Sequence, residues 1–310
     1  FTLFYIGINV GAFLSSLIVG YVGENIGWHY GFGLAGLGMA LGLAQYAVGQ
    51  KHLKHVGNFL GTSKSEADKE IMKKPLTKIE KDRVVVLLLS FVIVVLFWGA
   101  FEQAGGLMSV YTETKTDRML FGYLIPTPMF QGLNAGFIIL LAVWIANIWA
   151  KRKLKNKEAS SLFKMATGTI IMGLGFVFMI FAVKEYDAND SSGMQWLVLA
   201  YLFHTIGELC SSPVSLSFVT KLAPVKYASL MMGLYFAATG LGGKVAGILG
   251  EKSEHFGEYT IFAGIVVFTV VFGLLVIALL KPLKRLTHGA EDNEREMHND
   301  ETEGFELADN

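Results

Sequence analysis

The sequence predicts an all-α protein that crosses a membrane several times, and three observations lead to this prediction. Hydrophobic residues make up 53% of the 310 positions and charged residues only 17%, with a mean hydropathy of +0.47. This composition is not that of a soluble globular protein. Nearly uncharged runs of membrane length recur along the chain, and lysine and arginine gather in alternate connections between these runs.

Eight of these runs are long enough to cross the hydrocarbon core of a bilayer, which is about 30 Å thick. Each is interpreted as one transmembrane helix. The runs extend over residues 1–22, 27–50, 84–110, 129–150, 165–183, 196–222, 228–250 and 259–280.

The distribution of lysine and arginine predicts the orientation of the helices. Connection 51–83 carries nine of these residues, and the connection after the fourth run carries six. The turn 221–226 and the exit after the last run are also basic, whereas the alternate connections hold few basic residues. Because cytoplasmic loops of membrane proteins are enriched in lysine and arginine, we expect the basic connections and the C-terminus to be cytoplasmic.

The same pattern divides the chain into four parts. Residues 1–50 are expected to form two helices, 51–83 a cytoplasmic linker, 84–281 a bundle of six helices and 282–310 an acidic tail. The middle of the linker, 65–74, is interpreted as a solvated linker or as a short surface helix. From His288 onward the tail holds nine acids against one arginine, a composition typical of disorder.

Two further features limit what the chain contains. It begins inside an apolar run without Met, so we expect it to be part of a longer protein. Its one cysteine, Cys210, lies in an apolar run, which argues against a disulfide framework or a thiolate metal site. We predict no metal site.

The sixth run contains a carboxylate, Glu208, near its middle. Placing an acid at this depth costs at least ~2.5–3.5 kcal/mol, so the residue is expected to face a partner or a watery cavity. Ser212 lies four residues later on the same helix face, and Pro213 favours a kink just beyond it. His204 is one turn earlier on that face. We interpret it as a hydrogen-bonded packing residue, with a role in a proton relay as the alternative.

Three other runs carry pairs of residues that share a helix face. Tyr5 and Asn9 are four residues apart in the first run, as are Trp98 and Glu102 in the third. In the fourth run, Gln131 and Asn134 are three apart. For Asn9 a helix-packing role is the alternative, and for Trp98 a role in packing or as an interface anchor. For Glu102 the alternative is a position near the outer end of its helix, within reach of water. In the seventh run, Lys244 is a second charge within the membrane, which we interpret as partnering a carboxylate or a helix end.

Several of these strings together resemble the proton-dependent oligopeptide transporter (POT) family of the major facilitator superfamily. FTLFYIGINVGAF at 1–13 resembles the motif on that family's fifth helix, and FWGAFEQ at 97–103 its seventh. Gln131-x-x-Asn134 resembles the eighth helix. GELCSSP at 207–213, continuing into TKLAP at 220–224, resembles the tenth. The resemblance implies a major facilitator-type bundle, with eight spans present of an expected twelve.

The resemblance also implies a proton symporter that imports di- and tripeptides by alternating access. Its partners would be small peptides, protons and membrane lipid, with no nucleic acid, and the proton would be the coupling ion, without a cofactor. Glu208 would meet the amino terminus of the peptide, and Glu102 would take part in proton coupling together with Glu208. The other substrate-binding residues that the resemblance implies are Tyr5, Asn9, Trp98, Gln131, Asn134, Ser212 and Tyr235.

The chain departs from the family pattern in several places. The first-helix motif with paired glutamates and an arginine is missing, and so are helices two to four. The two extra helices that many bacterial members carry between the sixth and seventh are absent. Tyr235 stands at a position that is often Trp, which affects the shape of the cavity. Residues 184–195 are too few for the large extracellular domain of animal members, so a bacterial inner-membrane protein is expected.

Other functions remain open at the level of sequence. A facilitator-type symporter for another small solute, such as nitrate or a carboxylate, would use the same kind of bundle. A non-transporting membrane subunit would not need polar faces within its helices. We predict that the protein is not an enzyme, because the sequence shows no nucleophile–base pair, metal-ligand cluster or phosphate-binding loop.

Overall fold

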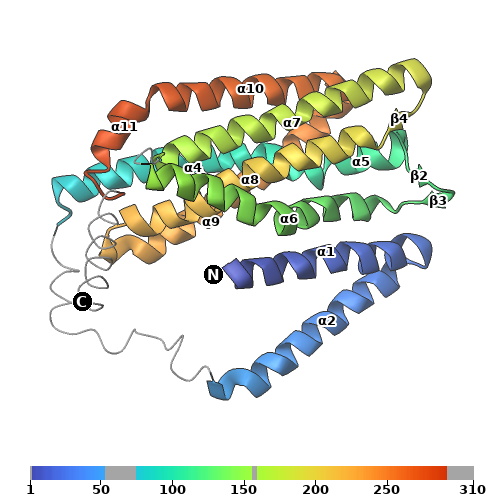
Figure 1. Cartoon of the computed structure of the whole chain (residues 1–310), viewed down its shortest axis with the longest axis horizontal. Coiled ribbons are helices and arrows are strands. Elements are labelled where there is room, and N and C mark those ends of the chain that lie inside the picture. The colour runs from blue at the N-terminus through green and yellow to red at the C-terminus, as the bar shows by residue number, and fades with distance from the viewer. Residues whose placement is uncertain (1, 53–74, 156–158, 292–310) are drawn as a thin grey trace.

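The computed structural model describes residues 2–52, 75–155 and 159–291, with side chains from Gly7 onward in the first of these segments. The middle of the predicted linker and the tail 292–310 lie outside the described residues. The described part contains eight helices that are long and apolar enough to cross a membrane, which confirms the number predicted from sequence (Figure 1). These helices and their direct continuations are α1 (Thr2–Asn25), α2 (Trp28–Gly49), α4 (Lys78–Phe101) with α5 (Leu107–Lys115), α6 (Thr127–Leu154), α7 (Ser161–Asn189), α8 (Gln195–Leu222), α9 (Ala228–Phe256) and α10 (Glu258–Ala278).

The remaining elements are short. Three of them are 3-10 helices: η1 (Gln50–His52), η3 (Glu102–Ala104) and η4 (Val225–Tyr227). Four two-residue strands, β1 (Thr116–Asp117), β2 (Met119–Leu120), β3 (Tyr123–Leu124) and β4 (Ser192–Gly193), form a parallel pair β1–β4 and an antiparallel pair β2–β3. All four lie at one end of the bundle, which we call the strand end (Figure 1). The opposite end carries α11 (Leu280–Leu286) and the basic connections, and we call it the basic end.

The third predicted span is one unbroken run in the sequence, but in the structure it is interrupted. Helix α4 ends at Phe101, η3 follows, and α5 begins at Leu107. Gly105 and Gly106 lie in this break, and glycine is a poor residue for continuing a helix. The start of the span also differs from the predicted boundary at residue 84. Thr77 and Glu80 form a capping box, so α4 begins at Lys78, inside the predicted linker.

Close helix contacts organise the bundle around α7 and α8. A Cβ atom added at Gly168 of α7 would lie 2.6 Å from the backbone oxygen of Gly207 on α8. The absence of side chains at these two glycines therefore lets the two backbones meet, as small residues do in membrane bundles. Two apolar clusters fill the interior, one around Phe176 and Phe262 toward the strand end and one around Phe218 toward the basic end.

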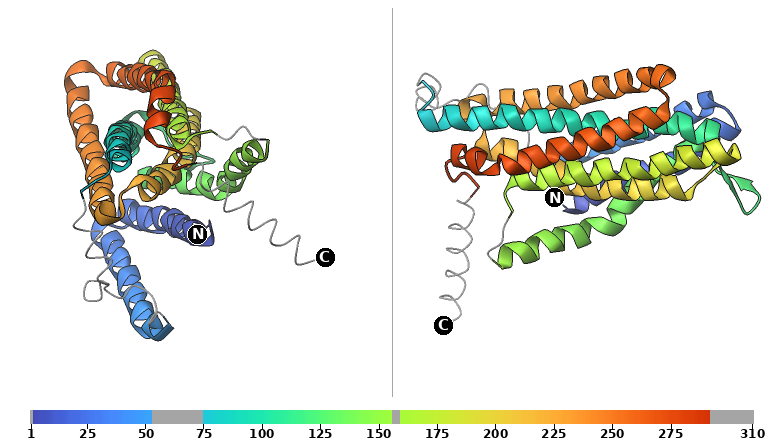
Figure 2. Two further views of the ribbon diagram at one scale, coloured as in Figure 1. Left: turned by 90° about the vertical axis from the view of Figure 1, so that its left-hand side faces the viewer. Right: turned by 90° about the horizontal axis from the view of Figure 1, so that it is seen from above.

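The first two helices are placed differently from each other. Helix α1 packs along α6, and a Cβ atom added at Gly20 would lie 2.9 Å from the Pro128 side chain. Helix α2 packs mainly on α1 and extends away from the other helices, as the left view of Figure 2 shows. Large apolar side chains such as Phe32 and Met39 are exposed along α2, which suits a surface in contact with lipid or with further helices.

The segment that follows α11 is tied back to the start of α4. Arg83 donates to the carbonyl oxygens of Thr287 and His288, at 3.1 and 3.4 Å. The His288 ring lies 2.7 Å from a carboxylate oxygen of Asp82. The first residues of the predicted tail, up to Glu291, therefore have a defined position at the basic end.

Candidate functional site

Glu208 is joined to Asn134 in the interior of the bundle. Glu208 lies on α8 with 8% of its surface exposed, so it does not face lipid. The Asn134 amide on α6 donates to a Glu208 carboxylate oxygen at 2.8 Å. Burying an unpaired carboxylate is costly, and a hydrogen-bonded amide supplies part of the solvation that water would otherwise give. The pair links α6 to α8 through two residues that lie 74 positions apart in the chain.

Thr205 and Tyr201 extend this hydrogen-bonded group along α8. Asn134 also donates to the Thr205 hydroxyl oxygen at 3.1 Å, and that hydroxyl donates to the Tyr201 carbonyl at 2.7 Å. The Tyr201 phenol donates to the carbonyl of Ala104 in η3 at 3.3 Å. Neither residue was singled out from sequence. Thr205 lies three residues before Glu208, and that spacing is the signal that identifies it.

Trp98 and Glu102 occupy the end of α4 beside this group. The Trp98 ring packs edge-to-face against Phe101 at 5.3 Å, and Phe101 in turn lies 6.4 Å from the His204 ring of α8. Glu102 begins η3 and is exposed, in keeping with a residue that water can reach.

Gln131 lies one turn of α6 from Asn134, toward the strand end. Its amide donates to the Ser109 hydroxyl of α5 at 3.2 Å, and its side chain is exposed. The structure therefore places Gln131 and Asn134 on one side of α6, but it gives them different partners.

Ser212 and Tyr235 lie closer to the basic end. Tyr235 on α9 is 5% exposed, and its hydroxyl lies 3.1 Å from the Ser215 hydroxyl of α8. Its ring also contacts Phe91 edge-to-face at 6.4 Å. Ser212 is half-buried, and its carbonyl accepts from Ser215 at 2.8 Å. Tyr235 thus sits in a packed helix contact, with Ser215 as a partner that sequence reasoning missed.

Asn9 on α1 is 7% exposed and takes part in polar contacts within the structure. Tyr5 precedes it by one turn of the same helix, but its side chain lies outside the described part.

His204 packs against neighbouring rings, as the sequence predicted, but the hydrogen bond that was also expected is not found among the described residues. It is 1% exposed, and its ring lies 4.5 Å from that of Phe176. Neither ring nitrogen has a hydrogen-bond partner among the described residues. A Cβ atom added at Gly175 would lie 2.6 Å from the imidazole, so α7 also packs on this ring.

Lys244 does not have the partner expected for it. Its side chain is exposed on α9, and within the described part of the chain it forms no hydrogen bond or ion pair.

A second polar contact joins α1 to α6 at the strand end. Arg118 donates to one Glu24 carboxylate oxygen at 2.6 Å, and the Thr127 N–H donates to the other at 2.7 Å. Glu24 therefore caps the first turn of α6, where the helix dipole favours negative charge. Arg118 also donates to the Ile125 carbonyl at 3.0 Å. Sequence reasoning missed this contact, because its partners are 94 residues apart.

The polar groups inside the bundle indicate a class of protein. A buried carboxylate and amide lie between helices of a membrane bundle, and the described residues contain no group of three or more side chains suited to hold a metal. Polar groups placed in this way in a membrane bundle are typical of transporters, which bind solutes between helices.

Comparison with known proteins identifies the family. A sequence profile of the POT family matches residues 1–67 and 58–260, so the chain belongs to the POT family. Peptide transporter YePEPT of Yersinia enterocolitica is 29% identical over 94% of this chain and 69% of its own length. A di-/tripeptide transporter of Lactococcus lactis is 26% identical over 92% of this chain and 68% of its own.

Solved structures of POT transporters share the fold. A peptide transporter POT in complex with alafosfalin superposes with a TM-score of 0.80 at 28% identity, over 92% of this chain and 67% of that one. A POT family transporter in complex with a thioalcohol-conjugated peptide has a TM-score of 0.80 at 25% identity, over 91% and 69%. The predicted fold, an integral membrane bundle of the major facilitator type, is thereby confirmed.

Proposed function

We propose that this protein is a proton-coupled symporter that imports di- and tripeptides by alternating access. The observation that carries the proposal is the buried Asn134–Glu208 pair, in a chain that belongs to the POT family. Relatives described as peptide and di-/tripeptide transporters support the substrate class, as do related structures with peptide-like ligands. Transport moves the peptide without breaking it, so no chemical step and no cofactor beyond the proton is proposed.

Glu208 is proposed to bind the amino terminus of the peptide. Burial removes water from the Glu208 carboxylate, and a peptide ammonium that enters beside it can take the place of that water. A hydrogen bond between an ammonium and a carboxylate is also stronger than one between neutral groups. Asn134 holds the carboxylate through one oxygen, which leaves the other for the ligand. Tyr5, Asn9, Trp98, Gln131, Ser212 and Tyr235 are proposed to contribute to the walls of the same site.

Glu102 is proposed to carry the coupling proton. It is exposed at the end of α4, where water can reach it and exchange protons with it. An inward proton releases about 2.3 kcal/mol for each 100 mV of membrane potential. This free energy corresponds to accumulation of a neutral peptide by a factor in the tens.

The contact at the strand end is proposed to hold one access route closed. Glu24 and Arg118 join α1 of the first helix pair to the loop before α6, so they separate when this end opens. Arg118 belongs to one of the connections poor in basic residues, so we propose that the strand end is extracellular and that the basic end and the C-terminus are cytoplasmic. The proposed location is a bacterial inner membrane.

The Glu102→Gln variant tests the coupling in proteoliposomes. We expect it to exchange labelled dipeptide for unlabelled dipeptide at a rate similar to the unchanged protein, because exchange needs binding and reorientation but no net proton movement. We expect accumulation driven by an acid exterior and an inside-negative potential to stop. Accumulation that persists in this variant would contradict the role of Glu102.

A further inference from the structure

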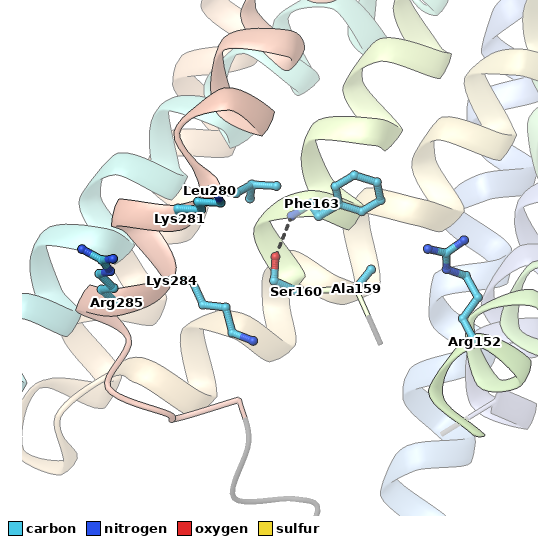
Figure 3. A pocket seen from close by; sticks show the side chains of 8 residues that line it. All are labelled: Arg152, Ala159, Ser160, Phe163, Leu280, Lys281, Lys284 and Arg285. Carbon is cyan, nitrogen blue, oxygen red and sulfur yellow. Dashed lines mark hydrogen bonds between the residues drawn. The ribbon is translucent and has the colours of Figure 1, made fainter. Parts of the chain in front are cut away.

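A pocket of about 570 Å³ lies at the basic end between α6, α7 and α11, away from Glu208. Figure 3 shows Arg152 on the α6 side of the opening and the basic residues of α11 on the other side, with Ser160 and Phe163 between them. The basic residues that line it are Arg152, Lys281, Lys284 and Arg285. The mechanism proposed above uses none of these residues.

The pocket is strongly cationic. Among the described residues that line it there is no carboxylate. The side chains of Arg152, Lys281 and Arg285 are exposed, and within the described part of the chain none of them has an ion-pair partner. The three positive charges of Arg152, Lys281 and Arg285, drawn from two helices around one opening, repel one another, so an anion bound between them relieves that repulsion.

The start of α7, beside the pocket, already holds an anionic group of the chain itself. Ser160 caps this helix, and its hydroxyl accepts from the Phe163 N–H at 3.3 Å. Next to it, the Ser161 N–H donates to the Glu291 carboxylate at 2.7 Å. The positive end of the α7 dipole is therefore balanced by a carboxylate of the chain, so binding of an added anion rests on the basic side chains of the pocket.

The position of the pocket relative to the membrane indicates which anion it suits. The α10 span ends at Ala278, and the pocket residues Leu280 and Lys281 follow almost at once. Arg152 lies in the last turn of α6, which is another spanning helix. The lining also includes the apolar side chains of Phe163 and Leu280. Cationic groups beside apolar ones at the end of a span match the level at which lipid phosphates lie.

We propose that this pocket binds a phosphate group, carried by an anionic phospholipid such as phosphatidylglycerol. Soluble phosphate offers the same chemistry, and the experiment below separates the two sources. The proposal does not depend on peptide transport, because it concerns residues outside the Glu208 site.

The test measures lipid binding to the purified protein in detergent by native mass spectrometry. Phosphatidylglycerol and phosphatidylcholine are compared, and inorganic phosphate is added as a competitor. The variant is Arg152→Gln/Lys281→Gln/Arg285→Gln. The matched control is Lys51→Gln/Lys221→Gln/Lys226→Gln, which removes the same number of charges from η1, the last turn of α8 and η4, at the same end but outside the pocket. Thermal unfolding midpoints close to that of the unchanged protein show that both variants are folded.

We expect the unchanged protein and the control to prefer phosphatidylglycerol. The pocket variant should lose affinity for it by about fivefold for each charge removed. An equal loss in both variants would show a general surface effect and overturn the proposal. Displacement of phosphatidylglycerol by millimolar inorganic phosphate would overturn the lipid as the source. The measurement is repeated with a shortened protein that lacks residues 292–310. If phosphatidylglycerol binds to the shortened protein but not to the intact one, carboxylates of the chain fill the pocket of the intact protein, and the proposal is wrong.

Discussion

At the scale of single residues, the hydrogen bonds of Asn134 give its amide a defined task. Its nitrogen donates to both Glu208 and Thr205, but these two acceptors differ in charge. Hydrogen bonds to charged groups contribute ~1.5–3 kcal/mol, against ~0.5–1.5 kcal/mol for neutral pairs. The bond to the carboxylate should therefore dominate the energetics of this group.

Two substitutions separate these bonds. Asn134→Leu leaves the buried Glu208 carboxylate without its described donor and should lower peptide affinity by about tenfold or more. Thr205→Val removes one neutral acceptor and keeps the Asn134–Glu208 bond, so it should change affinity by less than about threefold. Competition by an unlabelled dipeptide in counterflow measures both values. Equal effects of the two variants would contradict the ranking.

The sequence predicted part of this hydrogen-bonded group. The face-sharing pairs Gln131/Asn134 and Glu208/Ser212 drew attention to the two helices that the Asn134–Glu208 bond joins. Spacing within one helix does not say which residues of different helices meet. For that reason the Tyr201–Ala104 and Tyr235–Ser215 contacts, which are tertiary, were not predicted.

At the scale of elements, the helices follow from apolar runs, but their close contacts follow from glycine. The Gly168–Gly207 contact brings α7 and α8 together at the level of the Glu208 site, since Gly207 directly precedes Glu208. The number of spans was predictable because each run is long and nearly uncharged. The break at Gly105 and Gly106 was harder to foresee, because the apolar run continues through it.

Alanine substitutions test the helix contact. Gly168→Ala places a Cβ atom 2.6 Å from the Gly207 carbonyl oxygen, so the helices must separate, and overpacking of this kind costs ~1–3 kcal/mol. We expect the thermal unfolding midpoint in detergent to fall by several degrees. Gly233→Ala is the control, since a Cβ atom there meets nothing within 4 Å. A midpoint that falls equally in the control would show that the effect is not due to this contact.

At the scale of the whole molecule, the first two helices, α1 and α2, lie against the six-helix bundle that begins with α4. The main contact between the two groups is that of α1 with α6. The apolar part of this contact includes Gly20 and Pro128, and its polar part is the Glu24–Arg118 pair. Alternating access requires the two groups of helices to move relative to each other. We expect the partly buried Glu24–Arg118 ion pair at the strand end to be one of the contacts that break in such a movement.

Removing either charge tests this contact. Glu24→Gln should shift the equilibrium toward opening at the strand end by about tenfold, because it removes a charged hydrogen bond. Labelling of a cysteine introduced near this end should then become faster. Arg118→Gln removes the ion pair but keeps Glu24 as the cap of α6, and it should speed labelling as well. An Arg118→Gln variant that labels as slowly as the unchanged protein would rule out the ion pair as the cause.

The central claim is that Glu208 binds the amino terminus of a peptide, and one comparison tests it most directly. Counterflow competition is measured with a dipeptide and with its N-acetylated form, in the unchanged protein and in Glu208→Gln. The account predicts that the unchanged protein prefers the free amine by about tenfold to a hundredfold, as a charge-assisted contact of ~1.5–3 kcal/mol implies. It also predicts that Glu208→Gln loses this preference while still binding the acetylated form. An unchanged preference for the free amine in Glu208→Gln would contradict it.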